Sequence, residues 1–220
     1  MNTLLDEPLA SVLRRLSVDA EATMVDARQT IGRMAPGQFA EAIASKTGWR
    51  EFYALAKDFH LAISPETGRL LYLLARSTRA TQIVEFGTSF GVSTLYLAAA
   101  VRDNGGGRVI GSEFESSKAA VARQTMIDAC VDDIVEIREG DALETLSRQL
   151  PESIDLVLLD GAKALYAQVL AQLEPRMPKG ALVIADNVEM SPDYLAVIRS
   201  SERSWLSLPF GEDVEVSMKC

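Results

Sequence analysis

Histidine is almost absent from this sequence, which contains one, and cysteine is scarce, with two in 220 residues. The single histidine, His60, cannot build a multi-histidine metal site, so a structural role is expected for it. Cys130 and Cys220 lie far apart and have no metal-binding spacing. Reduced thiols in a cytoplasmic protein are therefore the simplest interpretation.

An excess of positive charge is also missing, because 22 Lys and Arg face 31 Asp and Glu, a formal net charge of −9. This balance argues against a nucleic-acid partner, which would need a basic face. No apolar run approaches the length of a membrane span, and the N-terminus lacks the basic and apolar regions of a signal peptide. We therefore expect a cytoplasmic protein that does not bind a membrane.

What the sequence does contain is a strand, a glycine turn and a helix, starting from the stretch QIVEFGTSFGVST at 82–94. Residues 82–86 are rich in β-branched and aromatic side chains, as in a strand buried on both faces of a parallel sheet. Gly87 and Gly91 follow, and an amphipathic run at 92–101 fits a helix. Such a unit places a ligand at the carboxyl end of its strand.

The spacing within this turn indicates the kind of ligand. A dinucleotide site uses G-x-G-x-x-G, because its backbone must approach a pyrophosphate at a helix N-terminus. Here the pattern is E-x-G-x-x-x-G, with Glu85 as the acid and no third glycine. An acid repels phosphate but suits the sulfonium and amine of S-adenosylmethionine. A purely structural tight turn is the alternative.

Residues 1–60 show only helical patterns. We expect a break at 17–19, a second helix through 24–34, and two short helices on either side of Gly48. This helical extension would cover the substrate or form a dimer contact, or simply pack against the sheet.

Residues 61–220 have the pattern of an α/β domain that begins with a helix capped by Ser64. Four further strands, each followed by a helical or turn segment, are expected at 108–112, 134–138, 154–159 and 181–185, and a terminal hairpin at 205–208 and 214–218. Strands alternating with helices predict an α/β, doubly wound, mostly parallel seven-stranded sheet of Rossmann-like type.

Acidic residues stand at or next to the carboxyl ends of four of these strands, and all parallel strands end at one edge of the sheet. Glu113 could accept both ribose hydroxyls of an adenosine, or act at the start of the next helix. Asp141 and Glu144 form a capping box for a helix that reaches Leu150. The backbone at Asp141 and Ala142 could also meet the edge of an adenine.

A sharper set is formed by Asp160, Asp186 and Asn187, which follow two strands of the sheet. Neighbouring strands are about 4.8 Å apart, so these side chains can converge on one ion. They supply only oxygen ligands, and this chemistry favours Mg²⁺. Lys163 lies within reach and could serve as a general base. The alternatives are a simple turn at Asp186 and Asn187, and a solvated surface lysine.

Together these motifs resemble the cation-dependent O-methyltransferases, the group of catechol and caffeoyl-coenzyme A O-methyltransferases. The resemblance runs from about residue 63 to the C-terminus. It rests on VEFGTSFGVSTLYLA, the acid in GSEFE, REGDALETL, DLVLLDGAK, ALVIADNV and GEDVEVSMK. It implies a class I methyltransferase fold and a Mg²⁺-dependent transfer of methyl from S-adenosylmethionine to a hydroxyl of a small catechol-like phenolic.

The resemblance also implies roles for individual residues. S-adenosylmethionine would be contacted by Ile63, Glu85, Gly87, Thr88, Ser93, Glu113, Asp141, Ala142 and Asp160. Asp160, Asp186 and Asn187 would be the metal ligands. Lys163, together with Asp160, would be catalytic.

The chain departs from this group in two places: the segment after Asn187 is short, and residues 1–60 match no motif. We therefore expect an open acceptor pocket, or one completed by the partner subunit of a homodimer. An NAD-dependent oxidoreductase on a similar sheet is one alternative function. A methyltransferase-like binding protein without catalysis is another, although such a protein has no use for Asp160, Lys163 and Asp186 together.

Overall fold

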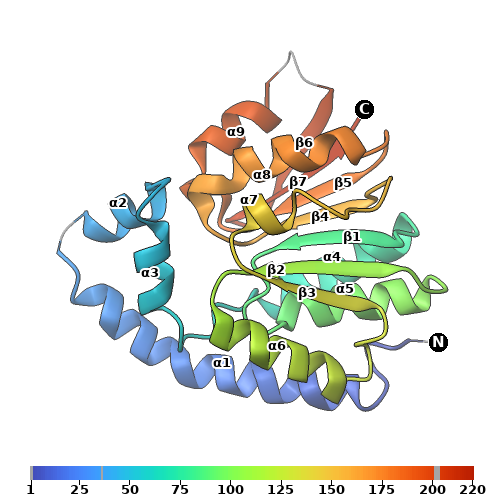
Figure 1. Ribbon diagram of the computed structural model, residues 1–220, viewed down its shortest axis with the longest axis horizontal. Helices are drawn as coiled ribbons and strands as arrows, with labels where there is room; N and C mark the ends of the chain where they lie inside the picture. Colours follow the sequence, from blue (N-terminus) through green and yellow to red (C-terminus); the bar gives the residue numbers. More distant parts are fainter. Residues whose placement is uncertain (1, 36, 201–203) are drawn as a thin grey trace.

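A seven-stranded sheet forms the centre of the computed structural model (Figure 1), which describes residues 2–35, 37–200 and 204–220. Its strands are β1 (Gln82–Phe86), β2 (Arg108–Glu113), β3 (Val135–Glu139), β4 (Leu156–Leu159), β5 (Leu182–Ala185), β6 (Trp205–Phe210) and β7 (Val214–Lys219). They lie in the order β3-β2-β1-β4-β5-β7-β6. β1 to β5 are parallel, and β7 and β6 form the antiparallel hairpin. The predicted fold class is confirmed.

The helices are α1 (Leu9–Gly32), α2 (Gln38–Ala44), α3 (Trp49–Leu55), α4 (Pro65–Ser77), α5 (Val92–Asp103), α6 (Ser116–Asp128), α7 (Ala142–Thr145), α8 (Tyr166–Leu173) and α9 (Pro192–Ile198). Short 3₁₀ helices lie at η1 (Lys163–Leu165), η2 (Glu174–Arg176) and η3 (Val188–Met190). α1, α4, α5 and α6 cover one face of the sheet, and α7, α8 and α9 cover the other (Figure 1).

The hydrophobic core has one part on each face of the sheet. Successive residues of a strand contribute to the two parts in turn. In β4, Leu156 and Leu158 join the apolar cluster under α4 and α5, whereas Val157 and Leu159 join the cluster under α8 and α9. All four side chains are fully buried. A continuous apolar run is what a strand covered on both faces requires. The parallel order reverses between β1 and β4, which places a ligand site at their carboxyl ends.

One predicted boundary is wrong, because α1 continues through Ser17–Asp19 without a break. The Ser17 hydroxyl donates to the carbonyl of Leu13, one turn earlier, at 2.9 Å. A serine that bonds back to its own helix in this way is tolerated in the helix interior. The helix after Asp141 is also shorter than expected, since α7 ends at Thr145 rather than near Leu150.

Helix α1 runs along the face of the sheet that α4 to α6 also cover, and α2 and α3 stand before its carboxyl edge (Figure 1). The first half of α1 packs on the α/β core through Leu9, Val12, Leu13 and Leu16. The division into residues 1–60 and 61–220 stays a prediction.

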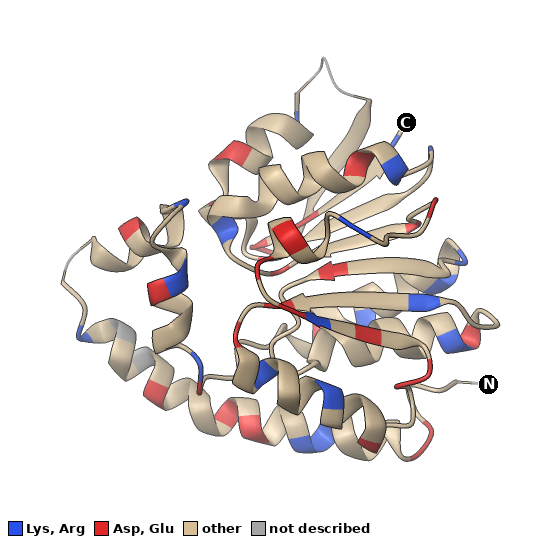
Figure 2. Ribbon diagram, viewed as in Figure 1, with Lys and Arg blue, Asp and Glu red and all other residues tan. Residues whose placement is uncertain are grey.

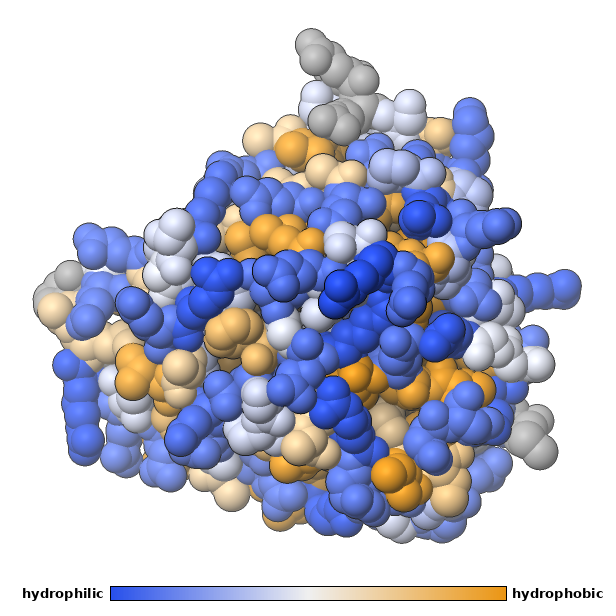
Figure 3. Space-filling view, viewed as in Figure 1, coloured by the Kyte–Doolittle hydropathy of each residue, from blue (hydrophilic) through white to orange (hydrophobic). Residues whose placement is uncertain are grey.

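Most of the face in Figure 3 is hydrophilic, and its apolar side chains lie in separate patches. Within the described part of the chain, every helix is too short or too polar to cross a membrane.

Candidate active site

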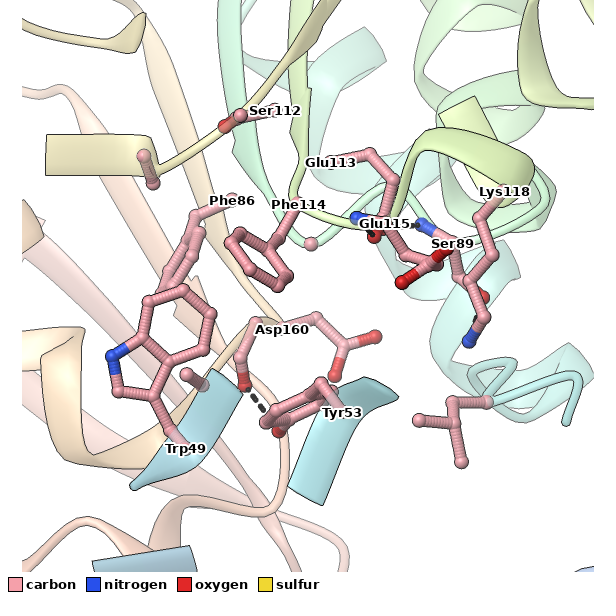
Figure 4. A pocket seen from close by; sticks show the side chains of 16 residues that line it. Trp49, Tyr53, Phe86, Ser89, Ser112, Glu113, Phe114, Glu115, Lys118 and Asp160 are labelled. Atoms are coloured by element: carbon pink, nitrogen blue, oxygen red, sulfur yellow. Dashed lines mark hydrogen bonds between the residues drawn. The ribbon is translucent and has the colours of Figure 1, made fainter. Parts of the chain in front are cut away.

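Three adjoining cavities lie at the carboxyl ends of the parallel strands, where acidic residues gather in Figure 2. The central cavity (Figure 4) lies among Phe86, Glu113, Phe114, Ala142 and Asp160. The small cavity lies beside Ile63, Thr88 and Ser93, and the outer cavity beside Lys163, Asp186 and Asn187. Gly87 lines the central and small cavities, and Asp160 lines the central and outer ones.

The fold therefore gathers most of the predicted site residues in one place. Two of them, Glu85 and Asp141, lie just outside the cavity walls. Leu61, in the segment between α3 and α4, lines all three cavities and was not singled out from the sequence.

Glu85 lies behind the glycine turn, where it is fully buried. Its carboxylate accepts hydrogen bonds from the hydroxyls of Thr88 at 3.0 Å, Ser93 at 2.6 Å and Thr94 at 2.6 Å. Burial raises the pKa of this carboxyl to about 7, although the three hydroxyls oppose that shift. The acid thus holds the turn together from inside.

Gly87 brings the turn after β1 against the loop after β4. Its φ is +99°, and a Cβ at this position would lie 2.5 Å from the backbone of Asp160. Only glycine combines this conformation with so close an approach. The glycine therefore sets the distance between the first turn and Asp160.

Glu113 ends β2 and points into the central cavity (Figure 4). Its two oxygens accept backbone N–H bonds from Ser89 at 2.7 Å and Glu115 at 2.8 Å. Burial raises its pKa, and these bonds oppose the shift. Each carboxylate oxygen can still accept a further bond, so the group remains able to bind hydroxyls. Glu113 can therefore both act at the start of the next helix and bind the hydroxyls of a ligand.

Lys118 of α6 was missed by the sequence analysis, because it stands among polar helix residues that look solvated. It is only 3% exposed and lines the central cavity. Its ammonium donates to the carbonyl of Phe59 at 2.9 Å and to the Ser89 hydroxyl at 3.5 Å. Burial lowers its pKa. The lysine ties the segment before α4 to the turn beside Glu113.

Asp141 caps α7, because its side chain accepts from the backbone N–H of Leu143 at 2.9 Å. It also forms an ion pair with Arg50 of α3. The predicted capping role is therefore present, and Ala142 beside it lines the central cavity.

Asp160 and Asp186 follow strand residues that pair directly, Leu159 with Ala185. The two side chains therefore leave adjacent strands at the same level and reach the same outer cavity. Burial, followed by the charge of Asp160, raises the pKa of Asp186 to about 7. Burial also raises the pKa of Asp160. Both shifts are those expected of carboxylates held close together out of water.

Asn187 completes this set from a left-handed backbone conformation, with φ 48°. Its amide nitrogen donates to the carboxylate of Asp213, in the β6–β7 turn, at 3.4 Å. The amide oxygen is then the atom left for a cation. The described residues hold no group of three His, Cys, Asp or Glu side chains placed for a metal.

Lys163 is buried at the start of η1 and donates to Asp160 at 2.9 Å and to the Tyr166 hydroxyl at 2.8 Å. That hydroxyl in turn donates to the carbonyl of Asp186 at 2.9 Å. Burial opposes the charge of Lys163, but Tyr166 and Asp160 raise its pKa well above the usual value. The lysine is therefore a charged donor here, and a role as base requires a change in the charge around Asp160.

The chain's own N-terminal helices contribute to the wall of the outer cavity. Met24 and Ala27 come from α1, Phe39 and Ile43 from α2, and Phe52 from α3. The open pocket, or one completed by a partner subunit, stays a prediction, as do the homodimer and the cytoplasmic location.

Comparison with known proteins agrees with this geometry. Residues 84–188 match the family model of a methyltransferase domain. The chain is 34% identical to a catechol O-methyltransferase of Niastella koreensis over 131 residues, 58% of each chain. It is 37% identical to a catechol O-methyltransferase of Mycobacterium tuberculosis over 139 residues, 62% of this chain and 61% of the relative.

Among solved structures, an O-methyltransferase from Bacillus cereus in complex with SAH superposes with a TM-score of 0.66 at 23% identity, covering 93% of this chain and 99% of that one. The chain therefore has a class I methyltransferase fold, and its residues 84–188 are similar to a methyltransferase domain. The resemblance that the motifs indicate is confirmed by these relatives. The matches span 58% and 61% of the length of the two catechol O-methyltransferases.

Proposed function

We propose that this chain is an S-adenosylmethionine-dependent O-methyltransferase that uses Mg²⁺ or a similar divalent cation to methylate a hydroxyl of a small, catechol-like phenolic. The observation that carries the proposal is the position of Asp160, which lines both the central and the outer cavity. A cofactor in the first and an acceptor in the second would meet at this residue. The names of the relatives support the reaction class.

The chemistry of the central and small cavities suits S-adenosylmethionine. Glu113 offers carboxylate oxygens to ribose hydroxyls, and the backbone beside Ala142 offers hydrogen-bonding groups to a base. Gly87 lines both cavities and has no side chain, so the sulfonium could lie close to its backbone. Ile63 and Ser93 would then border the methionine end.

The outer cavity suits a hard divalent cation, because Asp160, Asp186 and Asn187 supply oxygen ligands alone and leave coordination positions open. When bound, such an ion supplies positive charge that lowers the pKa of an acceptor hydroxyl and orients it. Two carboxylates with Lys163 as their close counter-charge can accommodate that added charge.

The chain's own residues would act mainly by position. Lys163 holds the Asp160 carboxylate, and Tyr166 links that lysine to the backbone of Asp186. This network fixes the acids relative to the cofactor turn. The N-terminal helices exclude water from the acceptor, so the acceptor oxygen and the methyl group are held in line.

The residues that line the outer cavity also indicate the shape and charge of the acceptor that would fit there. Phe39, Ile43, Phe52 and Met190 give it apolar and aromatic surfaces. Among the described residues that line it, Lys163 is the one lysine or arginine, and it is already paired with Asp160. A compact aromatic diol without negative charge fits these walls and this charge.

The proposal is tested with Asp186→Ala. We expect this variant to lose divalent-cation binding and methyl transfer to catechol-type acceptors while keeping its affinity for S-adenosylhomocysteine, as measured by calorimetry and labelled-methyl transfer. Asp193→Ala removes an exposed aspartate that pairs only with exposed Lys46 and serves as the matched control. Full activity of Asp186→Ala, or equal wild-type activity in EDTA, would remove the cation from the proposal.

A separate thermal-shift comparison addresses the oxidoreductase alternative. We expect S-adenosylhomocysteine to raise the melting temperature and NAD to leave it unchanged. The opposite result would replace the methyltransferase with an oxidoreductase.

A further inference from the structure

We propose that helix α3 of the N-terminal extension belongs to the cofactor site, and that Trp49 is a residue that contacts the adenine. This inference rests on the proposed function, because it takes the central cavity to be the site of S-adenosylmethionine. The sequence predicts for residues 1–60 a cover over the substrate, a dimer contact or simple packing against the sheet, and no contact with the cofactor.

Three side chains of α3 reach three separate loops at the carboxyl edge of the sheet. Trp49 packs edge-on against Phe114, which follows β2, with ring centroids 4.8 Å apart. Arg50 pairs with Asp141, which follows β3. The Tyr53 hydroxyl donates to the carbonyl of Gly161, which follows β4, at 3.1 Å. These loops carry Glu113, Ala142 and Asp160, so α3 is attached to every loop expected to hold the adenosine.

Trp49 is buried in the wall of the central cavity, in the same apolar cluster as Ala142 and Ala162 (Figure 4). A ribose bound at Glu113 would bring its base near the next residue, Phe114, which lines the same cavity. Trp49 is in direct edge-on contact with that ring, with centroids 4.8 Å apart. An adenine in the cavity would therefore lie beside this pair of rings, with the indole as part of its wall.

The loop after β4 shows why this chain needs an aromatic residue from elsewhere. It presents Asp160, Gly161 and Ala162 to the central cavity, and none of these is aromatic. Gly161 cannot be larger, because a Cβ there would lie 2.5 Å from the ring of Phe86. An aromatic surface on this side of the cavity thus comes from α3, through Trp49 and Tyr53.

Arg50 supports the outer side of the indole. Its guanidinium lies 4.8 Å above the Trp49 ring and pairs with Asp141, whose side chain is only 14% exposed. Tyr53 of the same helix lines both the central and the outer cavity, so α3 contributes to the walls of both.

Fluorescence can test this directly, because the chain has two tryptophans and the other, Trp205, lies in β6. In Trp205→Phe, Trp49 is the sole reporter. We expect its emission to change on titration with S-adenosylhomocysteine, with the midpoint found by calorimetry. The emission of Trp205 in Trp49→Phe should not change.

Affinity gives the second measurement. Trp49→Leu should raise the Kd for S-adenosylhomocysteine about tenfold, because base–aromatic stacking is lost. Trp49→Phe, which keeps an aromatic ring, should recover most of that affinity. Leu55→Ala, an exposed apolar residue of the same helix, should leave the Kd within about twofold of wild type.

The outcomes separate the two proposals. Absence of S-adenosylhomocysteine binding to the wild-type chain would overturn the proposed function and this inference together. Wild-type binding with an unchanged Trp49 emission, or an unchanged Kd in folded Trp49→Leu, would overturn this inference alone.

Discussion

The buried carboxyl of Glu85 makes the stability of this protein depend on pH in a direction that can be worked out. Burial raises its pKa from 4.5 to about 7, so the folded protein holds a proton there that the unfolded chain releases. Ionisation of the folded state is therefore unfavourable. Stability due to this group is greatest below pH 4.5 and falls as the pH rises towards the folded pKa.

The size of this effect follows from the two pKa values. A unit of pKa is worth about 1.36 kcal/mol, so the full penalty above the folded pKa is about 3 kcal/mol. At pH 5 the same expression gives only about 1 kcal/mol. Between pH 5 and pH 8, the ionisation of Glu85 should thus lower the free energy of unfolding by about 2 kcal/mol.

Glu85→Gln removes the ionisation and keeps the shape. A carboxamide can satisfy the same neighbours, because the hydroxyls of Thr88, Ser93 and Thr94 both donate and accept. Urea unfolding of both proteins should be measured at several pH values, and the difference between them taken so that other titrating groups cancel. That difference should shift by about 2 kcal/mol in favour of the variant between pH 5 and pH 8.

A further variant checks the cause. Thr94→Val removes one donor that lowers the pKa of Glu85, so the loss of stability with pH should become larger in this variant. A difference between wild type and Glu85→Gln that stays constant from pH 5 to pH 8 would show that Glu85 does not titrate in this range, and the reasoning would be refuted.

Two further predictions concern the turn and the lysine. Gly87→Ala should lower the free energy of unfolding by about 2 kcal/mol or more in urea titration, because its Cβ meets the Asp160 backbone. Gly180→Ala shares a left-handed φ but has open space around it, so it should cost clearly less; equal costs would contradict the steric argument. Lys163→Met should lower kcat for methyl transfer at least about tenfold with an unchanged Kd for S-adenosylhomocysteine. Loss of cofactor affinity in that variant would instead indicate a structural role.

The parts of the fold that could be predicted are those with strong local patterns. The continuous apolar run of β4 and the proline-led start of α4 after Ser64 predict their elements directly, and Ser64 accepts from the backbone of Thr67 as expected. The break predicted at Ser17–Asp19 failed for a local reason as well. A serine can end a helix, or it can stay inside one by donating its hydroxyl to the carbonyl one turn earlier. The local sequence is the same in both cases.

The candidate site was predictable where the chemistry sits at a strand end, as for Glu113, Asp160 and Asp186, because parallel strands bring such residues to one edge. It was not predictable where the role depends on distant partners. Trp49 and Lys118 have their roles through contacts with Phe114 and Phe59, and no spacing reveals such pairs. Glu85 lies between these two cases. Its partners are three hydroxyl residues that follow it closely in the sequence, so its role in holding the turn could have been suggested from the sequence.

The ion pair of Lys163 with Asp160 is difficult to explain by its contribution to folding stability. Both side chains are almost fully buried, at 6% and 10% exposure. Desolvation of two such charges offsets most of their attraction, and apolar replacements of similar volume often leave a fold as stable or more so. The network nevertheless extends through Tyr166 to the backbone of Asp186, so it holds both acids that line the outer cavity. An arrangement that adds little to folding, and that holds Asp160 where it lines both the central and the outer cavity, is best accounted for by the reaction proposed there.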